Sequence, residues 1–304
     1  MTNNTRSIGI FDSGVGGLTV LRAAYRQLPH ESVLYFGDTA RLPYGTRSPE
    51  EILRFVREIL TWMANCQVKM AVVACNTSSA LALETVRHEF NFPILGLILP
   101  GARAAVRRGK RIGVIATPAT AKSGAYRQAV LETNPSAHVW EVGCPEFVPI
   151  VEGNRIHHPQ TRQIVSKYLQ PLLKHRIDTL VYGCTHYPHL EPVLRTLLPE
   201  TVSLIDPAEY VVAAAARELD LLGLAASGES NEEGMSPTPK TRFCVSGCSQ
   251  SFADLSKQWL GFTPEVEKIW LPAIDARNSN QGTEPDQPEL DEEFVSLSEA
   301  NSEQ

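Results

Sequence analysis

The 304-residue sequence has few cysteines, few aromatic residues and no long apolar run. Six cysteines are too few for a disulfide scaffold in a chain of this length, so each cysteine is considered separately. No apolar stretch reaches the roughly 20 residues needed to span a bilayer, and the N-terminus has no hydrophobic leader. We therefore expect a soluble, cytoplasmic protein that has no membrane partner.

Basic runs are also absent, and the densest cluster of Lys and Arg is 107–111. With a net charge of -6, the chain has no electrostatic signature of a nucleic-acid partner, which favours small-molecule chemistry. Residues 276–304 are rich in acids and poor in apolar side chains, and we predict a disordered acidic tail there. Residues 227–241 have a similar composition and are predicted to form a flexible insertion.

Short apolar segments alternate with segments of helical period, which predicts an α/β fold with parallel sheets. One helix is predicted for Leu18–Leu28. A second is predicted to begin at the capping box of Ser48, which Pro49 follows, and a third to run from Pro188 through Leu197. A late strand is expected to start near Arg242. The other strand candidates are 7–11, 32–36, 70–75, 111–116, 178–182 and 202–205.

Two pairs of segments resemble one another in the same order along the chain. Residues 7–13 (SIGIFDS) resemble 111–117 (RIGVIAT), and residues 72–77 (VVACNT) resemble 181–186 (VYGCTH). Buried parallel strands are all rich in Val and Ile, so chance similarity is an alternative. Because polar residues at the strand ends also match, we predict two related, pseudo-symmetric lobes that face each other.

Residues just after parallel strands are the ones to examine for ligand binding. Residues 10–17 run into a glycine-rich turn, whose N–H groups are expected to be available to an anion. With Asp38 further on, the turn partly matches a dinucleotide fingerprint, but Thr19 replaces its last small residue. The carboxylate of Asp12 would also repel a pyrophosphate, so nucleotide binding is disfavoured.

A thiol follows two other strands at equivalent positions of the repeat, Cys75 and Cys184. Asn76 and Thr77 are predicted to cap a helix that runs through about Phe90. The N-terminus of a helix lowers the pKa of a thiol from its usual value of about 8.5. We therefore expect Cys75 to be available as a thiolate near neutral pH.

Two equivalent thiols on facing lobes can bracket one carbon atom, so that one removes a proton and the other returns a proton to the opposite face. This is the chemistry of a racemase or epimerase. The spacing of the two thiols does not fit a redox or zinc motif. Cys244 and Cys248 are interpreted as structural, and the pair at 157–158 as a solvated helix entry, so no metal is expected.

At these motifs the sequence resembles the glutamate racemases of the cofactor-independent aspartate/glutamate racemase superfamily. The resemblance extends from about Ser7 to Pro272. Its motifs are 9–17 (GIFDSGVGG), 35–40 (YFGDTA), 42–45 (LPYG), 74–77 (ACNT) and 183–188 (GCTHYP).

The resemblance implies interconversion of L- and D-glutamate for peptidoglycan biosynthesis, and hence for cell wall biogenesis and cell shape. It implies that Cys75 and Cys184 are the two acid/base residues, assisted by Asp12 and His186, with Glu152 orienting His186. It further implies a discontinuous first lobe (1–98 plus 207–275) and a second lobe (99–206). The implied substrate-binding residues are Asp12, Ser13, Pro43, Tyr44, Gly45, Asn76, Thr77, Thr185 and His186, with Thr117 and Thr120 as further hydroxyl donors.

The residues themselves add a physical reason to expect no cofactor. None of the strand ends examined offers a lysine for a pyridoxal Schiff base. An enzyme without such an electron sink must stabilise a carbanion with its own donors, in a site that excludes water. We therefore expect an enclosed site between the two lobes.

Several alternatives stay open at this point. An aspartate racemase, or one for a related amino acid, would share these motifs. A Cys-dependent amide hydrolase would use Cys184 with His186, although side chains two residues apart at a strand end are expected to diverge. An amino-acid-binding module without catalysis would keep Asn76, Thr77 and Thr185 but would not need two thiols. The oligomeric state is also open, with a homodimer among the alternatives.

Overall fold

The computed structural model describes residues 3–226 and 240–271. The predicted insertion at 227–241 falls outside this part of the chain except for its last two residues, and the predicted acidic tail at 276–304 falls outside it entirely. Both therefore stay predictions. Within the two described ranges, no helix has the length and apolar character needed to cross a membrane.

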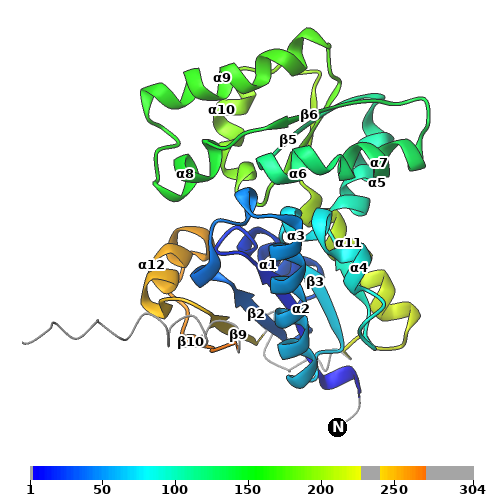
Figure 1. Ribbon diagram of the computed structural model, residues 1–304, viewed down its shortest axis with the longest axis vertical. Helices are drawn as coiled ribbons and strands as arrows, with labels where there is room; N and C mark the ends of the chain where they lie inside the picture. Colours follow the sequence, from blue (N-terminus) through cyan, green and yellow to red (C-terminus); the bar gives the residue numbers. More distant parts are fainter. Residues whose placement is uncertain (1–2, 227–239, 272–304) are drawn as a thin grey trace, which may run out of the picture.

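Two separate sheets, each built only of parallel strands, organise the described residues. Figure 1 shows the four-stranded sheet above the six-stranded one. The first sheet, in spatial order, comprises β10 (Val266–Lys268), β9 (Thr241–Val245), β2 (Val33–Gly37), β1 (Ile8–Asp12), β3 (Met70–Val73) and β4 (Ile94–Gly96). The second comprises β6 (His138–Gly143), β5 (Arg111–Ala116), β7 (Thr179–Gly183) and β8 (Ser203–Ile205).

Helices connect the strands of both sheets. The longer ones are α1 (Leu18–Gln27), α2 (Pro49–Asn65), α5 (Ile98–Arg108), α7 (Ala125–Thr133), α9 (Pro159–Lys174), α11 (Pro207–Leu221) and α12 (Ser249–Leu260). The short ones are α3 (Asn76–Leu81), α4 (Leu83–Val86), α6 (Pro118–Ser123), α8 (Phe147–Glu152) and α10 (Glu191–Arg195). Within the described ranges there are also four 3-10 turns: η1 (Asn3–Thr5), η2 (Thr39–Arg41), η3 (Tyr44–Thr46) and η4 (Tyr187–Leu190).

The two sheets repeat one strand order. In the first sheet β2, β1, β3 and β4 are neighbours in that order, and in the second sheet β6, β5, β7 and β8 take the equivalent places. The strands that share sequence motifs, β1 with β5 and β3 with β7, therefore match in space as well. The predicted α/β fold with two related parallel-sheet lobes is confirmed.

The helix after Cys75 is shorter than predicted. It begins at Asn76 but ends at Leu81, and a separate turn, α4, ends at Val86, so Phe90 lies beyond both. Its N-cap is Cys75 itself, whose sulfur accepts a hydrogen bond from the Ser78 N–H at 3.5 Å. The prediction of Asn76 or Thr77 as the cap was wrong, because sulfur is an uncommon cap that pattern rules do not anticipate.

The prediction of a helix from Pro188 through Leu197 was also wrong. Pro188 lies inside the 3-10 turn η4, and the α-helix that follows, α10, ends at Arg195 before reaching Leu197. In contrast, the capping box at Ser48 begins α2 as predicted, and α1 ends within one residue of the expected position. At the 157–158 pair, His158 caps α9, which matches the interpretation as a helix entry.

Helices α5 and α11 join the two lobes. Helix α11 packs against α1 and β4 of the first lobe and against α5 and β7 of the second. The largest cluster of buried apolar side chains likewise includes residues of both lobes, such as Val15 and Leu18 from one and Phe147 and Leu190 from the other. The lobes therefore share a packed interface. The exact boundaries between them stay a prediction.

Candidate active site

Four of the predicted side chains lie at the carboxyl ends of central strands. Asp12 ends β1 and Cys75 follows β3 in the first lobe, whereas Thr117 follows β5 and Cys184 follows β7 in the second. The two cysteines are 5% and 6% exposed. They are close enough that charge on Cys184 raises the pKa of Cys75. The repeat therefore brings one thiol from each lobe into the same buried region.

The glycine-rich turn binds the carboxylate of its own strand. The Gly17 N–H donates to Asp12 Oδ2 at 2.7 Å, and the Gly14 N–H donates to the same oxygen at 3.4 Å. The expectation that both groups would be available to a bound anion was wrong, because Asp12 already occupies them. The same contact argues against a pyrophosphate at this turn. Burial raises the pKa of Asp12, although His186 and these N–H groups oppose the rise.

Cys75 lies in an environment that disfavours its thiolate. Burial raises the pKa of the Cys75 thiol to about 12, and the nearby Asp12 carboxylate adds to the rise, whereas hydrogen bonding to Ser78 opposes it. The expectation of a lowered pKa at a helix N-terminus was therefore wrong. A helix of only six residues carries too little dipole to offset complete desolvation.

Cys184, His186 and Glu152 form a chain of contacts in the second lobe. His186 Nδ1 lies 3.6 Å from Cys184 Sγ, and His186 Nε2 lies 3.0 Å from Glu152 Oε1. Burial lowers the pKa of His186, but hydrogen bonds to Cys184 and Glu152 outweigh it and raise the pKa to about 10. These contacts therefore favour the imidazolium form of His186. Trp259 of α12 packs edge to face on its ring, at 5.5 Å between centroids.

This geometry revises one expectation about Cys184 and His186. Their side chains, two residues apart, were expected to diverge, yet they meet within hydrogen-bonding distance because the chain turns sharply between β7 and η4. The contact is the kind that a thiol nucleophile and a base require. The expected divergence of these two side chains therefore no longer counts against a Cys-dependent hydrolase.

Three threonine hydroxyls meet across the lobe interface. Thr77 Oγ1 lies 3.0 Å from Thr117 Oγ1 and 3.2 Å from Thr120 Oγ1, and the latter two are 2.9 Å apart. A Cβ atom placed on Gly45 would lie 2.9 Å from Thr117 Cβ, so the 42–45 loop of the first lobe also contacts the second lobe here. All three threonines are buried, and their hydroxyls hydrogen-bond to one another.

Thr185 is brought against the first lobe by the glycine-rich turn. A Cβ atom on Gly16 would overlap Thr185 Oγ1 and would lie 2.6 Å from the His186 ring. Ser13 lies in the same turn and is buried. Glycine at position 16 therefore lets the two halves of the predicted site approach each other closely.

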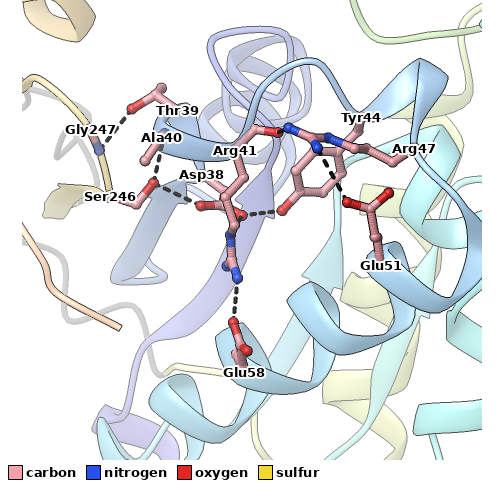
Figure 2. A network of polar contacts seen from close by, with 10 residues as sticks. All are labelled: Asp38, Thr39, Ala40, Arg41, Tyr44, Arg47, Glu51, Glu58, Ser246 and Gly247. Carbon is pink, nitrogen blue, oxygen red and sulfur yellow. Dashed lines mark hydrogen bonds and ion pairs between the residues drawn. The ribbon is translucent and has the colours of Figure 1, made fainter. Parts of the chain in front are cut away.

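A buried polar network holds the 38–47 loop (Figure 2). Asp38 accepts hydrogen bonds from Arg41 Nε at 2.6 Å, from Ser246 Oγ at 2.7 Å and from the hydroxyl of Tyr44. Arg41 also pairs with Glu58 of α2. The Tyr44 hydroxyl thus points into the network, so the predicted contact of Tyr44 with a substrate would have to involve its other atoms. The peptide bond between Leu42 and Pro43 in this loop is cis.

Three side chains near the site were not identified from the sequence. Asp38 was considered only as part of a dinucleotide fingerprint, although its position after β2 marks it as a strand-end residue. Tyr126 donates a hydrogen bond to Asn76 at 2.6 Å. Neither Tyr126 nor Trp259 belongs to a motif, so only their three-dimensional placement reveals them.

A cavity of about 720 Å³ lies elsewhere, among α4, α5, α7 and α11. None of the predicted site residues lines it. Its lining combines apolar residues with four arginines and three glutamates, which are Arg87, Arg103, Arg107, Arg217, Glu84, Glu132 and Glu218. The two thiols instead lie in a closed region. A search of the described residues found no group of three or more His, Cys, Asp or Glu placed to hold a metal ion.

Known proteins share the fold that carries these two thiols. The profile of the Asp/Glu/hydantoin racemase family matches residues 17–215. The chain belongs to the Asp/Glu/hydantoin racemase family. A glutamate racemase from Gloeothece citriformis is 64% identical over 265 residues, which cover 87% of this chain and 92% of that relative.

Solved structures of this racemase family share the fold. A glutamate racemase isoform from Bacillus anthracis superposes with a TM-score of 0.83 at 39% identity, covering 88% of this chain and 99% of that one. A glutamate racemase from Francisella tularensis, solved in complex with D-glutamate, gives a TM-score of 0.82 at 31% identity, covering 89% of this chain and 99% of that one. The resemblance to this racemase family is therefore confirmed.

Proposed function

We propose that this protein interconverts L- and D-glutamate without a cofactor, using Cys75 and Cys184 on opposite faces of the substrate. The observation that carries the proposal is the pair of buried thiols at equivalent strand ends of two related lobes. The relatives with the highest identity support glutamate as the substrate, since they are named glutamate racemases. The Francisella tularensis relative, which binds D-glutamate, supports it as well.

In the proposed reaction one thiolate removes the α-proton and the opposite thiol returns a proton to the other face. On one side Asp12 lies beside Cys75, and on the other side His186 contacts Cys184. His186 is in place to exchange a proton with Cys184, while Glu152 fixes the orientation of its ring. A positioned acid or base of this kind contributes about 10²- to 10⁴-fold to a rate.

The raised pKa of Cys75 assigns a role to the substrate itself. With a pKa of about 12, the Cys75 thiol by itself gives little thiolate at neutral pH. The ammonium group of a bound amino acid is a cation that favours the thiolate of a nearby cysteine. Substrate binding therefore favours the Cys75 thiolate that removes the α-proton. Before substrate binds, Cys75 stays a protonated thiol, which protects it from oxidation.

The charge that develops on the substrate is held by side-chain donors. The hydroxyls of Ser13, Thr77 and Thr185 and the amide of Asn76 are the proposed donors to the substrate carboxylates, together with Thr117 and Thr120. All are buried, so hydrogen bonds to them are formed away from bulk water and gain strength. Pro43, Tyr44 and Gly45 form the loop that closes this side of the site.

The proposal extends to the role and organisation of the protein. D-glutamate made in this way would supply peptidoglycan synthesis, as is typical of the family. The proposed lobes are 1–98 with 207–275, and 99–206, and the site lies between them. A homodimer is one assembly that this organisation allows.

Incubation with L-glutamate in D₂O, with no cofactor added, tests the proposal. We expect optical rotation to decay to zero and the α-proton signal to be replaced by deuterium. Cys75→Ser and Cys184→Ser should each abolish racemisation, because each removes the base or acid on one face. Wild-type rates in either variant would contradict the two-thiol mechanism, and aspartate assayed in parallel separates the two racemase activities.

The contact between Cys184, His186 and Glu152 favours one second candidate, a thiol-dependent amide hydrolase. Its chemistry needs only Cys184 as nucleophile, so it leaves Cys75 without a role. The discriminating measurement is release of ammonia from glutamine. Ammonia release that survives Cys75→Ser would favour the hydrolase, whereas racemisation that requires both thiols would exclude it.

A further inference from the structure

The side chain of Asn76 is held by a single contact from the other lobe. Asn76 opens α3 directly after Cys75, and it is 3% exposed. Its Oδ1 accepts a hydrogen bond of 2.6 Å from the hydroxyl of Tyr126 on α7. Its Nδ2 is buried and has no hydrogen-bond partner in the part of the chain that the structure describes. A buried amide N–H₂ without an acceptor is costly and calls for a ligand.

Tyr126 is rigidly placed for this contact. Its ring is fully buried, and a Cβ atom on Gly101 of α5 would lie 3.3 Å from Tyr126 Cε1, so α5 packs directly on the ring. Burial, with Asp206 and Glu141 adding to it, raises the pKa of the Tyr126 hydroxyl well above its ordinary value. The hydroxyl therefore keeps its proton and remains a donor throughout the physiological range.

Because the Tyr126 hydroxyl is always a donor, it favours one orientation of the Asn76 side-chain amide. With Oδ1 toward Tyr126, the hydroxyl proton is satisfied and Nδ2 faces the other way. If the amide were rotated by 180°, two donors would face each other and Oδ1 would take the place of Nδ2. A carbonyl oxygen in that place would repel a carboxylate, whereas the N–H₂ group attracts it.

We propose that Tyr126 is a positioning residue of the racemase, which orients Asn76 from the opposite lobe so that Nδ2 is presented to a carboxylate of the amino-acid substrate. This inference rests on the proposed function and adds a residue to it. It also links α7 of the second lobe to the first residue of α3, the helix that begins beside Cys75. The ligand chemistry is that of a carboxylate, because the free group is an N–H₂ donor that needs an acceptor and the amino-acid substrate supplies carboxylate oxygens.

The test is a double-mutant cycle between Tyr126→Phe and Asn76→Ala, with KM and kcat measured for glutamate racemisation. Tyr126→Phe removes one hydroxyl and keeps the ring. We expect KM to rise about five- to tenfold, the equivalent of one lost hydrogen bond, and kcat to change less than KM. Because Tyr126 acts through Asn76, the double variant should be no worse than Asn76→Ala alone.

Tyr182→Phe is the matched control. Tyr182 is as deeply buried, and its hydroxyl contacts Glu191 at 3.2 Å rather than a residue of the site. We expect its KM to equal that of the wild type. Additive effects in the cycle, or a Tyr126→Phe variant that loses thermal stability with an unchanged KM, would overturn the inference and leave the proposed function standing. A wild-type enzyme that does not racemise glutamate would overturn both.

Discussion

At the scale of one residue, the neighbours of His186 determine the pKa of its ring. Its ring contacts Cys184 and Glu152 within its own lobe, it is close enough to Asp12 of the other lobe for that carboxylate to favour its charged form, and the Trp259 ring packs edge to face on it. His189 also contacts the Trp259 ring, at 3.8 Å between centroids, and burial together with His186 lowers its pKa to about 4. One histidine is thus kept charged and its neighbour neutral, so the positive charge stays beside Cys184.

This charge predicts a pH dependence of stability. The pKa of His186 is about 10 in the folded protein and about 6.5 in an unfolded chain, so the folded state binds the proton more tightly. The stabilisation is complete below about pH 6.5 and is lost as the pH rises toward 10. Between pH 7 and 9 we expect the unfolding free energy of the wild type to fall by up to about 1.4 kcal/mol per pH unit relative to His186→Gln.

Urea denaturation of both proteins at several pH values measures this difference. The titration of thiols in the unfolded chain, with a pKa of about 8.5, is common to both proteins and cancels. Parallel stability curves from pH 7 to 9 would mean that His186 is not held as an imidazolium. That result would also remove its proposed role as a proton carrier for Cys184.

At the scale of elements, the 38–47 loop depends on one buried carboxylate. Asp38 is completely buried and accepts three side-chain hydrogen bonds, one of them from Ser246, which follows β9 late in the chain (Figure 2). We expect Asp38→Ala to lower the unfolding free energy by about 3–5 kcal/mol, because three buried donors, on Arg41, Tyr44 and Ser246, lose their acceptor together. Glu89→Ala, which breaks an exposed pair with Arg57, should cost less than about 1 kcal/mol. Similar losses in denaturant titrations of the two variants would contradict this view of the network.

Elements differ in how far the sequence alone predicts them. Helix α2 was predictable because its signals are local: a capping Ser48, Pro49 behind it and apolar residues at helical spacing. Strands β4, β6 and β10 were not identified, since two of them have only three residues and β6, at the edge of its sheet, begins at the exposed His138. The thiol cap of α3 and its early end depend on tertiary contacts, which no local pattern encodes.

At the scale of the whole molecule, the internal repeat was the most informative sequence feature. It predicted two lobes and identified Cys75 and Cys184 as equivalent, and the matching strand orders of the two sheets agree with it. The repeat did not predict how the lobes contact each other. Pairs such as Tyr126 with Asn76 join residues that lie far apart in the sequence, and Tyr126 belongs to no motif.

The closeness of the lobes predicts a strong effect of one added methyl group. Gly16→Ala would place a Cβ atom 2.6 Å from the His186 ring and against Thr185, so the loop after β7 must shift. A displacement of about 1 Å in a site of this kind costs about 100-fold in rate, whereas overpacking costs only about 1–3 kcal/mol of stability. We therefore expect kcat/KM to fall about 100-fold in a protein that still folds.

Gly14→Ala in the same turn is the control, because its Cβ would meet Leu42 at an ordinary 3.4 Å. Equal activity in the two variants, measured beside their denaturation midpoints, would show that contact between the lobes at Gly16 does not align the two halves of the site.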